Sequence, residues 1–192
     1  MTQQIDLIEG AIDRCRYAFT ETEDVVHKYD TSFPIAVFGT LRKIPRPMGN
    51  TQRMYEAHEP ASVRKGFIEH CTFVGIKTEF KQGGSGAVEV FFHEPEQFSE
   101  VIPSIDRLEG FSPGSGRRYG YGYHRTLLRA RLLPDDHSNT LFDRGINWDD
   151  RDLGIGQSEW KEFPWVPVWM YSNRRTNESL SDIKDGPLIW EG

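Results

Sequence analysis

The sequence is poor in cysteine, with only Cys15 and Cys71 among its 192 residues. Two thiols cannot build a framework of several disulfides or a four-sulfur zinc site. Histidine adds little, because His70 is the only histidine adjacent to a cysteine, and neighbouring residues of a strand point to opposite faces. We therefore expect reduced thiols and no metal site.

Long apolar runs are also missing, since no stretch of 18 apolar residues of the kind that spans a membrane occurs. The first residues have neither the basic stretch nor the apolar segment of a secretion signal. The net charge of −6 argues against a general nucleic-acid binder. These features together predict a cytoplasmic protein that uses neither a membrane nor a nucleic acid as its partner.

Aromatic residues are abundant, with 12 Phe and 5 Trp, which is typical of a folded domain rather than a disordered chain. The charge is uneven: residues 33–133 hold 14 Lys and Arg against 10 Asp and Glu, whereas residues 1–32 and 134–162 are acidic. A basic middle suits a small anionic ligand. Alternatively, the acidic flanks only solubilise loops and a surface helix.

The chain divides into three parts. Residues 1–32 carry apolar side chains at helical spacing and predict an N-terminal helical extension that docks on the domain or binds a protein partner. Residues 33–172 form the main domain, with an acidic, turn-rich insertion at 134–162 that offers a second surface for such a partner. Residues 173–192 read as a polar C-terminal tail.

Within the main domain, β-branched and aromatic runs predict strands. They lie at residues 34–38, 63–80 (two strands), 87–92, 123–132 and 166–171. Residues 96–108 have helical spacing, and Pro103 predicts a kink or two short helices. This mixture indicates an α+β fold, a small mixed β-barrel with flanking helices.

Several glycine-rich segments have plain structural interpretations. Residues 83–86 (GGSG) lack the lysine of a phosphate-binding loop and precede a strand, so they predict a hairpin turn. Residues 112–122 form an exposed loop; its basic and aromatic part favours a lid over a nucleic-acid contact. We expect no nucleophile elbow, which places a Gly-x-Ser-x-Gly motif between a strand and a helix, because the one such spacing, residues 110–114 (GFSPG), follows a helical stretch.

Two features carry possible chemistry. Gly39 follows a buried strand, and backbone N–H groups at such a turn can hold a carboxylate or an oxyanion. Glu109 ends an apolar helical stretch just before Gly110, and partial burial there would raise its pKa and let it transfer protons near neutral pH. On these residues alone, an ordinary helix end with a surface glutamate remains the alternative.

Six motifs in order resemble the γ-glutamylcyclotransferase-like family, including its AIG2-like branch, over residues 34–133 and 165–172. They are residues 37–42 (VFGTLR), 49–50 (GN), 86–90 (GAVEV), 105–111 (IDRLEGF), 123–125 (YHR) and 168–171 (VWMY). Each motif is weak alone, whereas their common order and spacing are fairly specific. The resemblance implies a small closed mixed barrel with flanking helices.

The resemblance also implies an activity and a site. Such enzymes cyclise a γ-glutamyl amine or γ-glutamyl peptide to 5-oxoproline and a free amine, and they need no cofactor. The catalytic acid and base would be Glu109. The substrate-binding residues would be Phe38, Gly39, Thr40, Leu41 and Arg42, with Tyr123 beside the pocket. A catalytically inactive AIG2-like binding module, which uses its pocket or its acidic extensions for a ligand or protein partner, is the alternative.

Overall fold

The computed structural model describes residues 33–42, 58–74, 77–111, 124–134, 162–172 and 188–191. This part of the chain contains six strands, one α-helix and two short 3-10 helices. In chain order they are β1 (Ile35–Val37), η1 (Gly39–Leu41), β2 (Ser62–Val74), β3 (Lys77–Phe92), η2 (Pro95–Gln97), α4 (Phe98–Glu109), β4 (His124–Leu132), β5 (Trp165–Ser172) and β6 (Leu188–Glu191).

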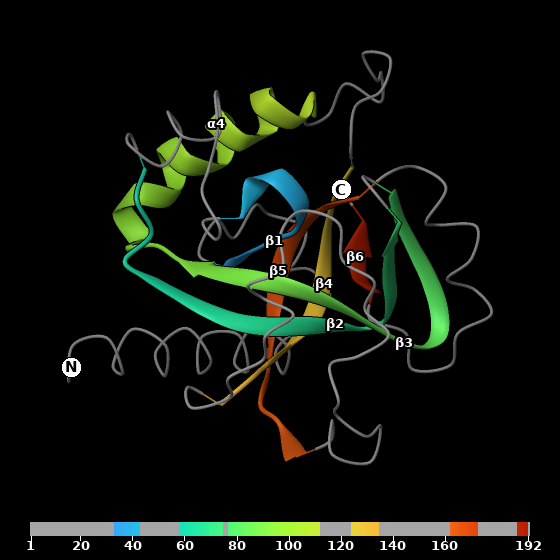
Figure 1. Cartoon of the computed structure of the whole chain (residues 1–192). Coiled ribbons are helices and arrows are strands. Elements are labelled where there is room, and N and C mark those ends of the chain that lie inside the picture. Colours follow the sequence, from blue (N-terminus) through green and yellow to red (C-terminus); the bar gives the residue numbers. More distant parts are fainter. Residues whose placement is uncertain are drawn as a thin grey trace.

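The strands form one mixed sheet in the order β2-β3-β1-β5-β4-β6. An additional pairing of β2 with β4 closes the first five of them into a small barrel, and β6 adds to β4 (Figure 1). β1 runs parallel to β5 and antiparallel to β3. The predicted α+β fold with a small mixed barrel is confirmed, and the four strands predicted at 34–38, 87–92, 123–132 and 166–171 share its sheet.

Residues 87–92 of β3 carry mostly apolar side chains on both faces because each face is buried against a hydrophobic core. Successive strand residues point to opposite faces, so Val88 and Val90 of β3 enter the core that the strands enclose, while Phe91 joins a second core beneath α4. This double burial explains the nearly continuous apolar run of residues 87–92.

The helix α4 lies across one side of the barrel and covers the outer core (Figure 1). Its inward face consists of Phe98, Val101, Ile102, Ile105 and Asp106, at the helical spacing seen in the sequence. The helix ends where Gly110 takes the left-handed conformation, with φ 69°, and its N–H bonds the Asp106 carbonyl.

Of the two outcomes predicted at Pro103, two short helices are wrong, because α4 runs unbroken from Phe98 to Glu109, and the kink stays a prediction. Pro103 is exposed, and so is Ser99, whose carbonyl loses the usual N–H partner. Water can bond a carbonyl on that side, so the proline does not stop the helix.

The predicted hairpin turn at residues 83–86 is also wrong, because this segment lies inside β3. The β2–β3 register shifts between Glu69 and Cys71, and Gly83 and Gly84 lie in the resulting bulge, whereas Gly86 pairs with Ile68. Gly83, with φ 81°, donates its N–H to Nδ1 of His70 at 3.0 Å. Glycine suits the left-handed backbone that occurs both in turns and in some β-bulges. The glycine-rich sequence therefore did not distinguish a turn from a bulge.

Other expectations fall on residues outside the described ranges. They include the helical extension at 1–32, the loop at 112–122 and nearly all of the insertion at 134–162. The segment expected to be a polar tail supplies β6, which pairs with β4. Across the part of the chain that the structure describes, no helix has the length and apolar character to cross a membrane.

Closure of the barrel depends on Gly66, which faces Leu132 across the β2–β4 pairing. A Cβ at this position would stand 2.6 Å from the backbone oxygen of Arg131, and backbone cannot move aside as a flexible side chain can. Gly66→Ala should therefore lower the free energy of unfolding by about 1–3 kcal/mol in urea titrations. Lys77→Ala, on an exposed side chain, should change it by less than about 0.5 kcal/mol. Equal stability of both variants would contradict the closed barrel.

Candidate active site

The first candidate feature is the turn that follows β1. Phe38 is extended, Gly39 has φ +59°, and the Arg42 N–H returns to the Gly39 carbonyl at 3.4 Å. Glycine suits this left-handed position because it has no Cβ. Among the described residues, no atom lies within 4 Å of the place where a Cβ on Gly39 would stand. The described residues therefore leave space beside the turn backbone.

The side chains of the turn go to different places. Phe38 is half-buried and stacks on Phe73, with ring centroids 4.2 Å apart. Leu41 is buried in the outer core beneath α4. The Thr40 side chain and all of Tyr123 lie outside what the structure describes.

Arg42, expected to bind the substrate, is only 2% exposed. Its Nε lies 3.5 Å from Oε1 of Glu89, a buried carboxylate on the outer face of β3. The structure thus gives Arg42 an ion pair beneath the turn. Arg42 would therefore attract a bound anion only through its electrostatic field, from a buried position, and not by direct contact at the surface.

The second candidate feature is Glu109, the last residue of α4. It lies one turn beyond Ile105 on the inward face of the helix and is half-buried. Burial raises its pKa to about 7 from an ordinary value of 4.5. At neutral pH such a carboxyl is present in both protonation states, as a group that both takes and returns a proton requires.

The turn and the end of α4 belong to one apolar layer. Leu41 from η1 packs in the same cluster as Ile105, Leu108 and Phe111, and η1 lies beneath the C-terminal half of α4 in Figure 1. The predicted substrate turn and the predicted catalytic carboxyl therefore come from elements that pack together, although they are far apart in the sequence.

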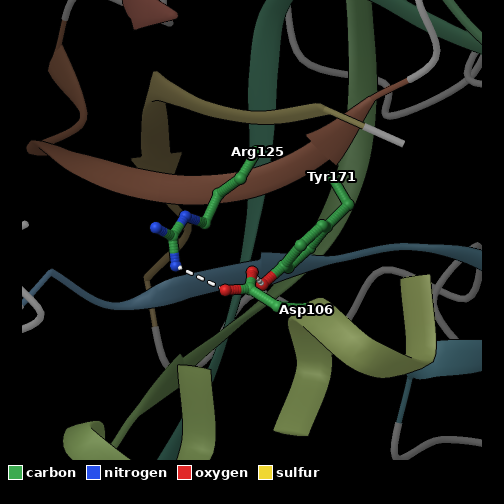
Figure 2. Close-up of polar contacts among 3 residues, drawn as sticks. All are labelled: Asp106, Arg125 and Tyr171. Atoms are coloured by element: carbon green, nitrogen blue, oxygen red, sulfur yellow. Dashed lines mark hydrogen bonds and ion pairs between the residues drawn. The ribbon is translucent and has the colours of Figure 1, made fainter. Parts of the chain in front are cut away.

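The structure also shows a buried polar cluster that the sequence did not predict. Oδ1 of Asp106 accepts a 2.6 Å hydrogen bond from the Tyr171 hydroxyl, and Oδ2 accepts one of 3.3 Å from Arg125. Figure 2 shows Arg125, from β4, and Tyr171, from β5, pointing toward Asp106 on α4. Burial raises the pKa of Asp106, and its bonds with Tyr171 and Arg125 oppose that rise.

One feature of the sequence could have indicated this cluster. Asp106 falls on the helix face defined by Ile102 and Ile105, and a carboxylate at an inward position needs a partner. Arg125, the last residue of the YHR motif, is only 3% exposed. Its distant partner could not be read from local spacing.

Two glutamates on the strands form ion pairs. Glu69 accepts a 2.9 Å hydrogen bond from Nε of Arg131 across the β2–β4 closure, and Glu89 pairs with Arg42. Within the described ranges, no group of three His, Cys, Asp or Glu residues could hold a metal ion, and Cys71 is a buried free thiol. Glu69 and Glu89 thus have ion-pair partners in the barrel wall, whereas Glu109 is half-buried at a helix end and its burial raises its pKa.

Comparison with known proteins adds no family assignment. No protein-family model, curated protein or solved structure matches this chain. The γ-glutamylcyclotransferase-like resemblance therefore rests on the order of the motifs in the sequence.

The raised pKa of Glu109 has a measurable effect on stability. Below about pH 4.5 the carboxyl is neutral in both the folded and the unfolded chain, whereas above pH 7 the folded chain must hold it ionised against burial. Stability from this group is thus present at low pH and is lost as the pH rises from 4.5 through 7. Relative to the wild type, Glu109→Gln should gain roughly 1–3 kcal/mol between pH 4 and pH 8 in urea unfolding. A difference between the two proteins that does not change with pH would contradict the assigned pKa.

Proposed function

We propose that this chain is a cytoplasmic enzyme of the γ-glutamylcyclotransferase type, with Glu109 as its catalytic acid and base. It would convert a γ-glutamyl amine or γ-glutamyl peptide to 5-oxoproline and a free amine. The observation that carries the proposal is the half-buried carboxyl of Glu109, whose pKa of about 7 suits proton transfer at neutral pH. The small closed barrel and the ordered motifs of the sequence support it.

In this reaction the substrate attacks itself. The α-amino nitrogen of the glutamyl group forms a bond to its own γ-carbonyl carbon, and the bond from that carbon to the departing nitrogen then breaks. Because the ring closure is intramolecular, holding the glutamyl chain folded supplies much of the rate.

The proton transfers need a single carboxyl. An α-ammonium group cannot attack, so ionised Glu109 would first remove its proton. Protonated Glu109 would then give this proton to the leaving nitrogen. Because the lactam nitrogen keeps only one hydrogen, the second proton that it loses also passes to the departing amine, directly or through water, and the amine leaves as an ammonium ion at neutral pH. A group whose pKa lies near the working pH performs both steps at low energetic cost.

The turn after β1 would hold the anionic parts of the substrate. Backbone N–H groups of Gly39–Leu41 would bind the α-carboxylate or the oxyanion that forms on the γ-carbonyl. The described residues leave room beside Gly39 for a ligand to approach the backbone. Arg42, in its ion pair with Glu89, would hold the turn against the barrel.

The proposal is tested by incubating the purified chain with a panel of γ-glutamyl compounds and measuring 5-oxoproline and amine release. The panel should contain γ-glutamyl amino acids, a γ-glutamyl peptide, the γ-glutamyl amide of a lysine side chain and γ-glutamyl alkylamines. We expect release from at least one class. Binding of these compounds without release would favour the inactive binding module, and neither binding nor release would contradict both functions.

A further inference from the structure

The end of α4 is fixed from two sides, and Glu109 lies between the fixed points. On the backbone side, the Asp106 carbonyl accepts the N–H of Gly110 and, at 2.8 Å, the N–H of Phe111. On the side-chain side, the carboxylate of Asp106 is bonded to Tyr171 and Arg125. One residue thus joins the last turn of the helix to the barrel wall.

Phe111 closes the other end of this segment. Its ring lies 5.2 Å from the Arg125 guanidinium carbon and meets the Tyr171 ring edge-on at 6.5 Å. The Arg125 guanidinium also lies 5.0 Å from the ring of Trp169. Residues 106 and 111 therefore both contact the same pair of barrel side chains, and the segment between them carries Glu109.

This arrangement is more demanding than helix packing requires. Asp106, Arg125 and Tyr171 are only 6%, 3% and 2% exposed, and apolar side chains would cover the sheet without the desolvation of two charges. The polar cluster also sets the orientation of α4. Hydrogen bonds to both carboxylate oxygens of Asp106 fix the rotation of the helix about its axis as well as its distance from the sheet.

We propose that Tyr171 is a positioning residue, which acts through Asp106 and Phe111 to hold the last turn of α4 and so keeps Glu109 half-buried at the end of that helix. The consequence for catalysis rests on the proposed function, whereas the position of Glu109 does not. Loss of the Tyr171 hydroxyl would loosen the helix end and admit water to Glu109. Its carboxyl would then titrate closer to an ordinary glutamate.

The direct test is the titration of Glu109 by NMR of carboxyl-labelled protein, in the wild type and in Tyr171→Phe. The matched control is Thr126→Val, which removes a buried hydroxyl that bonds the Met170 carbonyl on the same pair of strands but does not contact α4. Among the described residues, the ionisable side chains that face α4 from neighbouring segments are Arg42, His58, Glu89, His93, Arg125 and Tyr171. Neither variant changes a formal charge at neutral pH.

We expect Glu109 to titrate near pH 7 in the wild type and in Thr126→Val, and about one pH unit lower in Tyr171→Phe. With an accepted substrate, kcat of Tyr171→Phe should fall about tenfold with KM little changed, and the acid limb of its pH profile should move with the new pKa. An unchanged Glu109 titration in folded Tyr171→Phe would overturn the positioning role.

A second variant covers the case in which Tyr171→Phe does not fold. Phe111→Ala removes the half-buried ring that contacts Arg125 and Tyr171, but it leaves the Asp106 hydrogen bonds in place. It should shift the Glu109 titration in the same direction, because Tyr171 then holds the helix end through Asp106 alone. An unchanged titration would overturn the proposal that Tyr171 acts through both residues. If the Glu109 titration differs between the wild type and Tyr171→Phe but the wild type turns over no γ-glutamyl compound, the proposed function is refuted and the positioning role of Tyr171 stands.

Discussion

Replacing Glu109 with glutamine is expected to reduce turnover of a γ-glutamyl substrate by about 10²–10⁴-fold, the usual effect of losing a general acid and base. Glutamine keeps the size of the side chain but can neither accept the ammonium proton nor return one to the leaving nitrogen. Substrate binding depends on the turn after β1 in this account, so KM should change little. Steady-state kinetics of 5-oxoproline release measure both quantities.

Two matched variants make this result specific. Glu100→Gln changes an exposed carboxylate on the same helix, and Glu69→Gln changes one that pairs with Arg131 on the barrel wall. Both should retain wild-type turnover within a few-fold, provided that circular dichroism shows them folded. If folded Glu109→Gln released 5-oxoproline at the wild-type rate, Glu109 would not be the proton carrier.

Arg42→Met is expected to lower the free energy of unfolding by about 3–5 kcal/mol, because it removes a cation that lies 3.5 Å from the buried carboxylate of Glu89. Methionine fills a similar volume, so the loss of charge and not of packing dominates. Both side chains are almost completely buried, and screening by solvent is therefore weak. Chemical denaturation at pH 7 measures the effect.

The double variant Arg42→Met/Glu89→Gln serves as the control. It removes both charges together and should recover most of the lost stability, since replacing a buried ion pair by neutral groups is often close to neutral. Loss of stability in the double variant equal to that in Arg42→Met would show that Arg42 acts through packing. An unchanged melting temperature in the single variant would contradict the buried pair.

Much of the fold was readable from the sequence, because the strands and α4 follow simple burial rules. Residues 87–92 and 166–171 are apolar on both faces, and the barrel buries both. The predictions that failed concern residues whose sequence is compatible with two different local structures. The glycines at 83–86 suit either a turn or a bulge, and the His70–Gly83 contact that decides for the bulge is non-local.

The candidate site was readable in part. Glu109 was expected to have a raised pKa because an apolar helix precedes it, and its burial raises the pKa to about 7. The burial of Arg42 was not foreseen, because an arginine beside a glycine turn suits anion binding as well as it suits an ion pair with Glu89. The Asp106 cluster joins residues from α4, β4 and β5, and such a contact depends on the closed sheet rather than on local pattern.

The central claim is the intramolecular reaction, and oxygen labelling tests it most directly. An accepted γ-glutamyl amine is incubated with the wild-type protein in water enriched in oxygen-18, and the products are analysed by mass spectrometry. Self-attack by the α-amino nitrogen uses no water, so we expect unlabelled 5-oxoproline and a free amine. Glutamate that carries one oxygen-18 would show hydrolysis and contradict the intramolecular reaction.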